Sequence, residues 1–407
     1  MRHLSRWRGF VQARRFALVF SSASFLVWST WYVLHPNRHP FGDLSQGSYT
    51  DHFSHLSAAR LFPRVGADIW RKPVRSLVLP LTPEDIQQLP SDLRPLAGPE
   101  GPFKVPGWPL TKPYNSSWSA IPRQYPPGDM VLVAPFALLY HFGPISFSQM
   151  NRLLIIYFLL LAHLSIYLAV NSFLRYQASS IVGLVGLVLC YFELIHWPLE
   201  GFYDVAYVGP LIASFGLLLA GRRAAALAAY AGATLIHFRA FFYAPIAIYA
   251  ACGILLRREW RDWGRREVAL MATVVVLGGA SLYTFALLWP SLRQQEISNP
   301  IGFVPHWPNP TFISFVVLSG LIAAALGWAR AWTDLAFLLW MSLMWICLPY
   351  AYSWYILALV PWVMAGPLWS RPERANLVRD ARLLFMLFTS AFACGYAPLP
   401  TWLTHVF

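Results

Sequence analysis

Charged residues are scarce in this 407-residue chain and make up only 12% of it. Soluble domains carry about 25%, so the chain lacks the polar surface that a water-soluble domain needs. Hydrophobic residues account for 57%, and apolar runs of about 20 residues, long enough to cross a membrane, recur along the sequence. This combination excludes a soluble globular protein and predicts a polytopic protein embedded in the lipid bilayer.

Lysine is rarer still, with three residues, and nearly all basic residues are arginine. A formal charge of +13 would suit a nucleic-acid partner, but the arginines gather in short segments between apolar runs. Such segments are typical of cytoplasmic loops that follow the positive-inside rule, so we expect no nucleic acid. A composition rich in arginine and poor in lysine also supports the hypothesis of a GC-rich bacterial source.

Cysteine is almost absent. The four cysteines all lie within apolar segments and show no zinc-binding or redox spacing, so we interpret them as packing residues; they are Cys190, Cys252, Cys347 and Cys394.

The N-terminus has a basic stretch followed by an apolar run over residues 16–34. The run is too long for a signal-peptide core and has no small-residue cleavage site, so we expect a retained first span. If the N-terminus is cytoplasmic, residues 36–150 form a large extracytoplasmic loop. The apolar stretch 130–142 within this loop is too short for a span and suits a helix lying at the interface.

The whole chain, residues 1–407, is predicted to be a single all-α membrane domain with about eleven crossings. The arginine-rich segments 257–266 and 371–382 then both face the cytoplasm. The predicted spans are 16–34, 153–174, 180–196, 205–220, 224–236, 241–256, 268–289, 313–328, 335–349, 355–368 and 383–398.

Ionisable residues at a membrane mouth are costly to keep there, which makes them candidates for function. Asp51 precedes a stretch, 53–62, that we expect to form a short amphipathic helix. Its carboxylate either stabilises the start of that helix or belongs to a site. Asp204 follows between two spans on the outer side, where a carboxylate is normally solvated.

Two further segments fall on the same predicted face. Arg239 and His237 lie where a short outward helix turns back. Arg239 either snorkels to lipid headgroups or binds phosphate, because a guanidinium fork matches phosphate oxygens. Arg123 and Tyr125 lie just before the interfacial helix, where they would be loop residues near headgroups or part of the same site.

At these positions the chain resembles the GT-C class of membrane glycosyltransferases, most closely GPI mannosyltransferase I and bacterial polyprenyl-phosphomannose-dependent enzymes. The resemblance rests on segments that occur in the same order over roughly 300 residues. They are Tyr49-Thr50-Asp51, Arg123-Gln124-Tyr125-Pro126-Pro127, the Asp204 turn, His237-Phe238-Arg239 with Tyr243-Ala244-Pro245, and Ala351-Tyr352-Ser353-Trp354-Tyr355.

The resemblance implies a GT-C-like helical bundle and an inverting transfer of a sugar, most often mannose, from a polyprenyl-phosphate donor to a glycolipid or glycan acceptor. Asp51 would be the general base, with Arg239, His237 and Arg123 on the donor phosphate. Residues expected to bind substrate are His52, His55, Tyr125, Asp204, Tyr352, Trp354 and Tyr355, although an interfacial aromatic belt also explains the last three.

We expect no cofactor and no essential metal, although His52 and His55 beside Asp51 leave a metal site open. The expected location is a bacterial inner membrane, with the active site facing the periplasm or exterior. The alternative function is a transporter or flippase of lipid-linked sugars. Transporters place polar groups near the midplane, often in repeated halves, whereas here the candidates lie at one face. A non-catalytic partner of another membrane enzyme is a third possibility.

Overall fold

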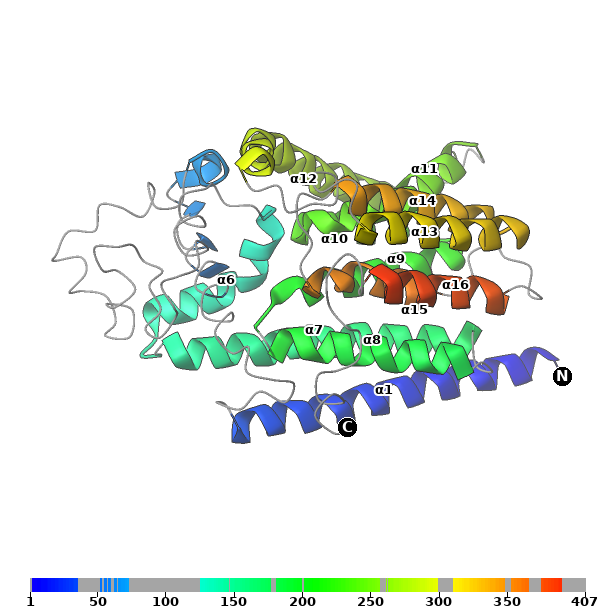
Figure 1. Ribbon diagram of the computed structural model, residues 1–407. Helices are drawn as coiled ribbons and strands as arrows, with labels where there is room; N and C mark the ends of the chain where they lie inside the picture. Colours follow the sequence, from blue (N-terminus) through cyan, green and yellow to red (C-terminus); the bar gives the residue numbers. More distant parts are fainter. Residues whose placement is uncertain are drawn as a thin grey trace.

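The computed structural model shows a bundle of roughly parallel helices, with α6 and the short helices near it gathered at one end (Figure 1). No strand occurs among the residues that the structure describes. These are 2–35, 52, 55–56, 58–59, 62–63, 65–72, 125–145, 147–176, 181–199, 201–256, 261, 263–298, 310–347, 353–365 and 375–389.

The elements follow the apolar runs of the sequence closely. The α-helices are α1 (Arg2–Leu34), α6 (Pro127–Phe142), α7 (Phe147–Tyr176), α8 (Ile181–Leu199), α9 (Val208–Leu219), α10 (Arg223–Ile236), α11 (Ala244–Leu256), α12 (Arg265–Ser298), α13 (Pro310–Trp328), α14 (Trp332–Cys347), α15 (Val360–Met364) and α16 (Ala375–Phe388). Four 3₁₀ helices join them: η1 (Gly66–Trp70), η3 (Tyr203–Tyr207), η4 (Phe238–Tyr243) and η7 (Ser353–Ala358).

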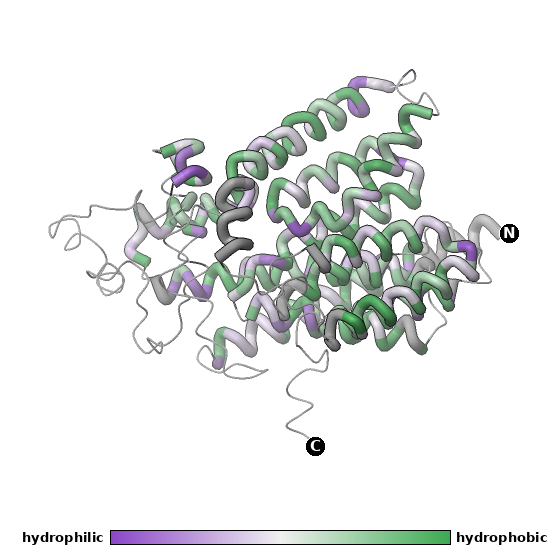
Figure 2. The backbone as a smooth tube through the Cα atoms, turned by 45° about the horizontal axis from the view of Figure 1, so that its top comes forward, coloured by the Kyte–Doolittle hydropathy of each residue, from purple (hydrophilic) through white to green (hydrophobic). Residues whose placement is uncertain are grey.

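Four helical segments are long and apolar enough to cross a membrane: Val11–Leu34, Gln149–Leu174, Phe238–Leu256 and Arg265–Trp289. Hydrophobic colouring runs along the bundle (Figure 2). The prediction of an all-helical protein with helices able to span a membrane is thus confirmed for the residues that the structure describes. The count of about eleven crossings and the outer loop 36–150 stay predictions, because other apolar helices are shorter and most of that loop lies outside the described residues.

Helix α1 is joined to α7 and α8 by a chain of hydrogen bonds that runs in one direction. The indole of Trp28 donates to the Tyr191 hydroxyl at 2.7 Å, and that hydroxyl lies 2.7 Å from Ser24 Oγ. Ser24 Oγ is 2.9 Å from His163 Nε2, while His163 Nδ1 lies 2.7 Å from the carbonyl oxygen of Leu159. Because a carbonyl only accepts, Nδ1 carries the proton and Nε2 accepts from Ser24.

Helices α14, α15 and α16 meet around a buried ion pair. Arg382 Nε donates to Asp334 Oδ1 at 2.7 Å, and Arg382 Nη1 donates to the carbonyls of Trp362 and Ala365 at 3.1 and 2.8 Å. The sequence-based assignment of 371–382 to a cytoplasmic loop is therefore wrong for its last part. Arg382 lies inside α16 and is 1% exposed, because one carboxylate and two carbonyls replace its water shell.

The segment 355–368, predicted to be one span, also differs from that prediction. Over its described part it consists of two short helices, η7 and α15, rather than one continuous helix. Pro361 lies in the first turn of α15, where it lacks an amide proton and disfavours helical geometry in the preceding residue. η7 contacts both η3 and η4, so the break brings this late segment to the turns described next.

Candidate functional site

The site is built on η3 and η4, the two short turns that follow α8 and α10. Gly201, at φ +85°, ends α8, and its left-handed conformation suits glycine. Its amide donates to the Pro198 carbonyl at 2.9 Å, and the Phe202 amide donates to the Trp197 carbonyl at 2.9 Å. This paired closure is typical of a helix C-terminus, and it turns the chain so that Asp204 enters the protein interior.

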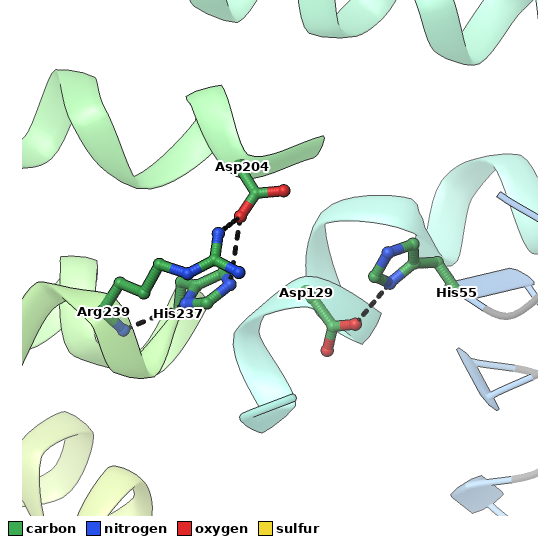
Figure 3. A network of polar contacts seen from close by, with 5 residues as sticks. All are labelled: His55, Asp129, Asp204, His237 and Arg239. Atoms are coloured by element: carbon green, nitrogen blue, oxygen red, sulfur yellow. Dashed lines mark hydrogen bonds and ion pairs between the residues drawn. The ribbon is translucent and has the colours of Figure 1, made fainter. Parts of the chain in front are cut away.

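Asp204 is the centre of a buried polar cluster with Arg239 and His237 (Figure 3). Its Oδ1 accepts from Arg239 Nη1 and lies 3.2 Å from His237 Nε2. The backbone amide of Arg239 donates to His237 Nδ1 at 3.0 Å. Nδ1 is therefore an acceptor, and the proton of the neutral ring lies on Nε2, facing the carboxylate.

The surroundings set the charge of each member of this cluster. Burial alone would raise the pKa of Asp204, but the Arg239 charge and the contact with His237 outweigh it and leave that pKa below its ordinary value. Burial, assisted by the Arg239 charge, lowers the pKa of His237 to about 4 against the opposing effect of Asp204. At neutral pH, His237 is thus a neutral hydrogen-bond donor that faces Asp204.

A second carboxylate–imidazole pair lies beside the first. His55 Nδ1 is 2.6 Å from Asp129 Oδ2, and Asp129 Oδ1 accepts from the Met130 amide at 2.7 Å. Both side chains are fully buried, at 1% and 0% exposure. Asp129 lies in the first turn of α6. The preceding Gly128 lies against the end of α10, where a Cβ atom would come within 2.5 Å of the Leu235 carbonyl oxygen.

Two tyrosines lie between the two pairs. The ring centre of Tyr203 is 4.1 Å from that of His55 and 5.7 Å from that of His237. Tyr125 lies 5.1 Å from His55 and 5.6 Å from His237. The Trp70 indole fixes the Tyr125 backbone by donating to its carbonyl at 2.8 Å. The described site is thus an aromatic layer with a carboxylate–imidazole pair on each side.

His52 lies at the edge of this layer. Its Nδ1 is 2.5 Å from Asn151 Oδ1 in α7, and its ring contacts Phe158 at 5.5 Å, which in turn lies 6.3 Å from Tyr203. Burial lowers the pKa of His52 to about 4, although the hydrogen bond with Asn151 opposes this. The ring is therefore neutral and is held by packing and a single amide.

The structure brings together five residues that the sequence singled out from four separate segments: His55, Tyr125, Asp204, His237 and Arg239. Asp204, expected to be solvated, is buried. Asp51, Arg123 and Tyr352 lie outside the described residues. Trp354 and Tyr355 belong to η7, and only their backbone is described. Within the described part of the chain, no group of three His, Cys, Asp or Glu side chains is arranged to hold a metal ion.

The sequence analysis missed Asp129 and Tyr203. A signal for Asp129 was present, because Pro126-Pro127-Gly128-Asp129 places prolines at a helix start and a carboxylate in its first turn. Tyr203 had no such signal. An aromatic residue next to a loop carboxylate is ordinary at a membrane interface, and only the tertiary structure places it between two histidines.

Comparisons of the chain with protein-family models, with curated proteins and with solved structures find no match.

Proposed function

We propose that the chain is an inverting membrane glycosyltransferase of the GT-C type. In this proposal it moves a sugar, with mannose as the first candidate, from a polyprenyl-phosphate donor to a lipid-linked or glycan acceptor. The bundle would have about eleven spans, and the large first loop and the site would face the periplasm or exterior of a bacterial inner membrane. The basis for the class is the ordered set of sequence segments that resembles this family.

The observation that carries the proposal is the gathering of Asp204, His237 and Arg239 with His55 and Tyr125 at one place. These residues come from segments that are far apart in the sequence, and each belongs to a segment on which the resemblance rests or adjoins one. A lipid-linked sugar phosphate presents a phosphate and a sugar ring at the membrane surface. A guanidinium suits the first, and aromatic rings pack against the second.

The proposed chemistry is a single displacement at the anomeric carbon. Asp51 removes the proton of the acceptor hydroxyl while the hydroxyl oxygen attacks the anomeric carbon. The bond to the phosphate oxygen breaks on the opposite side, and Arg239 stabilises the charge that develops on the departing phosphate. Asp204 holds the guanidinium in position, and the neutral His237 ring directs its Nε2–H at that same carboxylate.

The test is sugar transfer by purified protein in nanodiscs, with radiolabelled polyprenyl-phosphate mannose and a panel of lipid acceptors. We expect transfer by the native protein and its loss in Asp51→Asn, with donor binding retained. Arg239→Lys keeps the charge but loses the planar fork, so we expect weaker donor binding together with slower transfer.

The matched control is Asp68→Asn, which removes a carboxylate whose partner is the exposed Lys72. We expect this variant to transfer sugar at the native rate. Transfer that survives Asp51→Asn would refute the assignment of the base. If the native protein carries labelled donor across the bilayer of proteoliposomes without cleaving it, the protein is a flippase and the proposal fails.

A further inference from the structure

The two carboxylate–imidazole pairs hold their histidines in opposite tautomers. In His237 the backbone amide of Arg239 occupies Nδ1, so the ring proton lies on Nε2 and faces Asp204. In His55 it is Nδ1 that faces the carboxylate, at 2.6 Å from Asp129 Oδ2. A neutral ring has one donor and one acceptor nitrogen, so the acceptor nitrogen of His55 depends on the charge of Asp129.

Two contacts stabilise Asp129 as a carboxylate. Its Oδ1 accepts the Met130 amide at 2.7 Å, and the residue lies in the first turn of α6. The positive end of the helix dipole stabilises negative charge there. An ionised carboxylate only accepts hydrogen bonds, which assigns the proton to His55 Nδ1. Nε2 then carries the lone pair and is the basic atom of the ring.

The position of His55 relative to Arg239, the residue proposed to bind the donor phosphate, suits a base. The rings of Tyr203 and Tyr125 contact His55 on one side and His237 on the other, and Arg239 is next to His237 through its amide. Figure 3 shows the Asp129–His55 pair and the Asp204 cluster as neighbours on different elements. An in-line displacement needs this separation, because the proton leaves on one side of the sugar and the phosphate departs on the other.

We infer that the proton which Asp51 removes from the acceptor hydroxyl passes on to His55 Nε2, and that Asp129 is the positioning residue that fixes His55 in the required tautomer. The inference rests on the proposed glycosyl transfer and adds a group that takes the proton on from Asp51. As the hydroxyl oxygen bonds to the anomeric carbon, the electron pair of the broken bond leaves with the phosphate. The proton ends on His55, where the imidazolium pairs with the Asp129 carboxylate, and it passes to solvent before the next turnover.

The charged groups around His55 define the expected pH dependence. Asp129 faces the ring directly from α6, and Asp204, Arg239 and His237 lie beyond the tyrosine rings. Transfer needs the neutral ring, so the rate falls as acidification protonates His55. Removing the Asp129 charge disfavours the imidazolium and moves this acid limb to lower pH. It also makes His55 a weaker base, which slows transfer above the limb.

The experiment measures kcat, donor binding and the pH profile of sugar transfer for native protein, Asp129→Asn and His55→Ala in nanodiscs. For Asp129→Asn we expect kcat to fall by at least about tenfold, donor affinity to stay within twofold of native, and the acid limb to move to lower pH. For His55→Ala we expect transfer to be lost and to be partly restored by added imidazole, which a purely structural role for His55 would not produce.

His163→Gln is the control, since it removes another buried histidine, in α7, away from these pairs. It should leave the position of the acid limb unchanged and show no response to imidazole. A native kcat and an unmoved limb in Asp129→Asn, or a folded His55→Ala that binds donor but does not respond to imidazole, would overturn the inference. Loss of transfer in Asp51→Asn alone would leave the proposed function standing, whereas an inactive native protein would remove both.

Discussion

Tyr243 accepts a hydrogen bond from the backbone amide of Trp362 at 3.0 Å, and the same hydroxyl donates to the carbonyl of Ala358 at 2.5 Å. The contact joins the end of η4 to the broken segment formed by η7 and α15. All three residues are buried. One tyrosine hydroxyl thus fixes the turn that carries Arg239 against a segment more than a hundred positions later.

The Tyr243 hydroxyl is expected to contribute strongly to stability. Tyr243→Phe removes the donor to the buried Ala358 carbonyl and leaves the Trp362 amide with its 3.1 Å bond to the Leu359 carbonyl. A buried group left unsatisfied costs about 1–3 kcal/mol. We expect a clear fall in the midpoint of thermal unfolding in detergent. Tyr283→Phe, at a side chain that is 56% exposed on α12, should leave the midpoint unchanged. Equal midpoints for the two variants would show that the bridge adds no stability.

The Asp334–Arg382 pair gives a prediction about non-additivity. Removing one partner of a buried ion pair leaves the other charge uncompensated and costs about 3–5 kcal/mol. We expect Asp334→Asn and Arg382→Gln each to destabilise strongly, with Arg382→Gln the worse, because Arg382 also serves the Trp362 and Ala365 carbonyls. The double variant should lose much less than the sum of the two. Additive losses in a double-mutant cycle would mean that the pair is not coupled.

Acid should weaken the folded state through its buried histidines. The pKa of His237 falls from 6.5 to about 4 on folding, mainly because the ring is buried. The unfolded chain therefore binds a proton below pH 6.5 that the folded chain refuses until about pH 4, and stability drops across that window. We expect the unfolding midpoint to fall from pH 7 to 4.5.

Substitution of His237 should make the unfolding midpoint depend less on pH. His237→Gln removes one of the titrating groups, and His52→Gln should remove a similar share, since the pKa of His52 is also lowered to about 4. The double variant should lose more of the pH dependence than either single one. A slope identical to that of the native protein in all three variants would contradict this account.

Gly128 is expected to tolerate no side chain. In Gly128→Ala the new methyl group would come within 2.5 Å of the Leu235 carbonyl oxygen, so α6 must move away from α10 and carry Asp129 with it. We expect a loss of about 1–3 kcal/mol from overpacking and slower sugar transfer. Gly232→Ala is the matched control in α10, with open space around the new methyl group. It should be neutral or gain up to about 1 kcal/mol. A native unfolding midpoint and transfer rate in Gly128→Ala would refute the close contact.

Hydropathy predicted the helices well because it follows from transfer of side chains into lipid. The apolar runs 153–174 and 268–289 lie within α7 and α12. The same reasoning failed for Arg382, since an arginine near an apolar run looks like a loop marker unless its carboxylate partner is known. Asp334 lies 48 positions earlier, and no local pattern connects the two.

In the site, too, local sequence features were predictable, whereas tertiary contacts were not. Motif order brought Asp204, His237 and Arg239 to attention, yet it assigned Asp204 to substrate binding and the other two to the donor phosphate, whereas the structure makes all three one cluster. The charge state of His237 depends on burial and on the Arg239 amide, which are tertiary properties. Asp129 was readable as a helix-start carboxylate, but its pairing with His55, 74 positions earlier, is a tertiary contact that no local pattern predicts.

The one-way chain of donors from Trp28 to the Leu159 carbonyl gives α1 a single rotational setting. Ser24 and Trp28 are four positions apart and so lie on one face of the helix. Turning α1 by one residue, about 100°, would carry both away from Tyr191 and His163 and leave their polar groups facing hydrocarbon. These hydrogen bonds therefore allow α1 to pack against α7 and α8 in only one rotational orientation. An apolar helix without Ser24 and Trp28 would still enter the bilayer, but nothing would fix its rotation against α7 and α8.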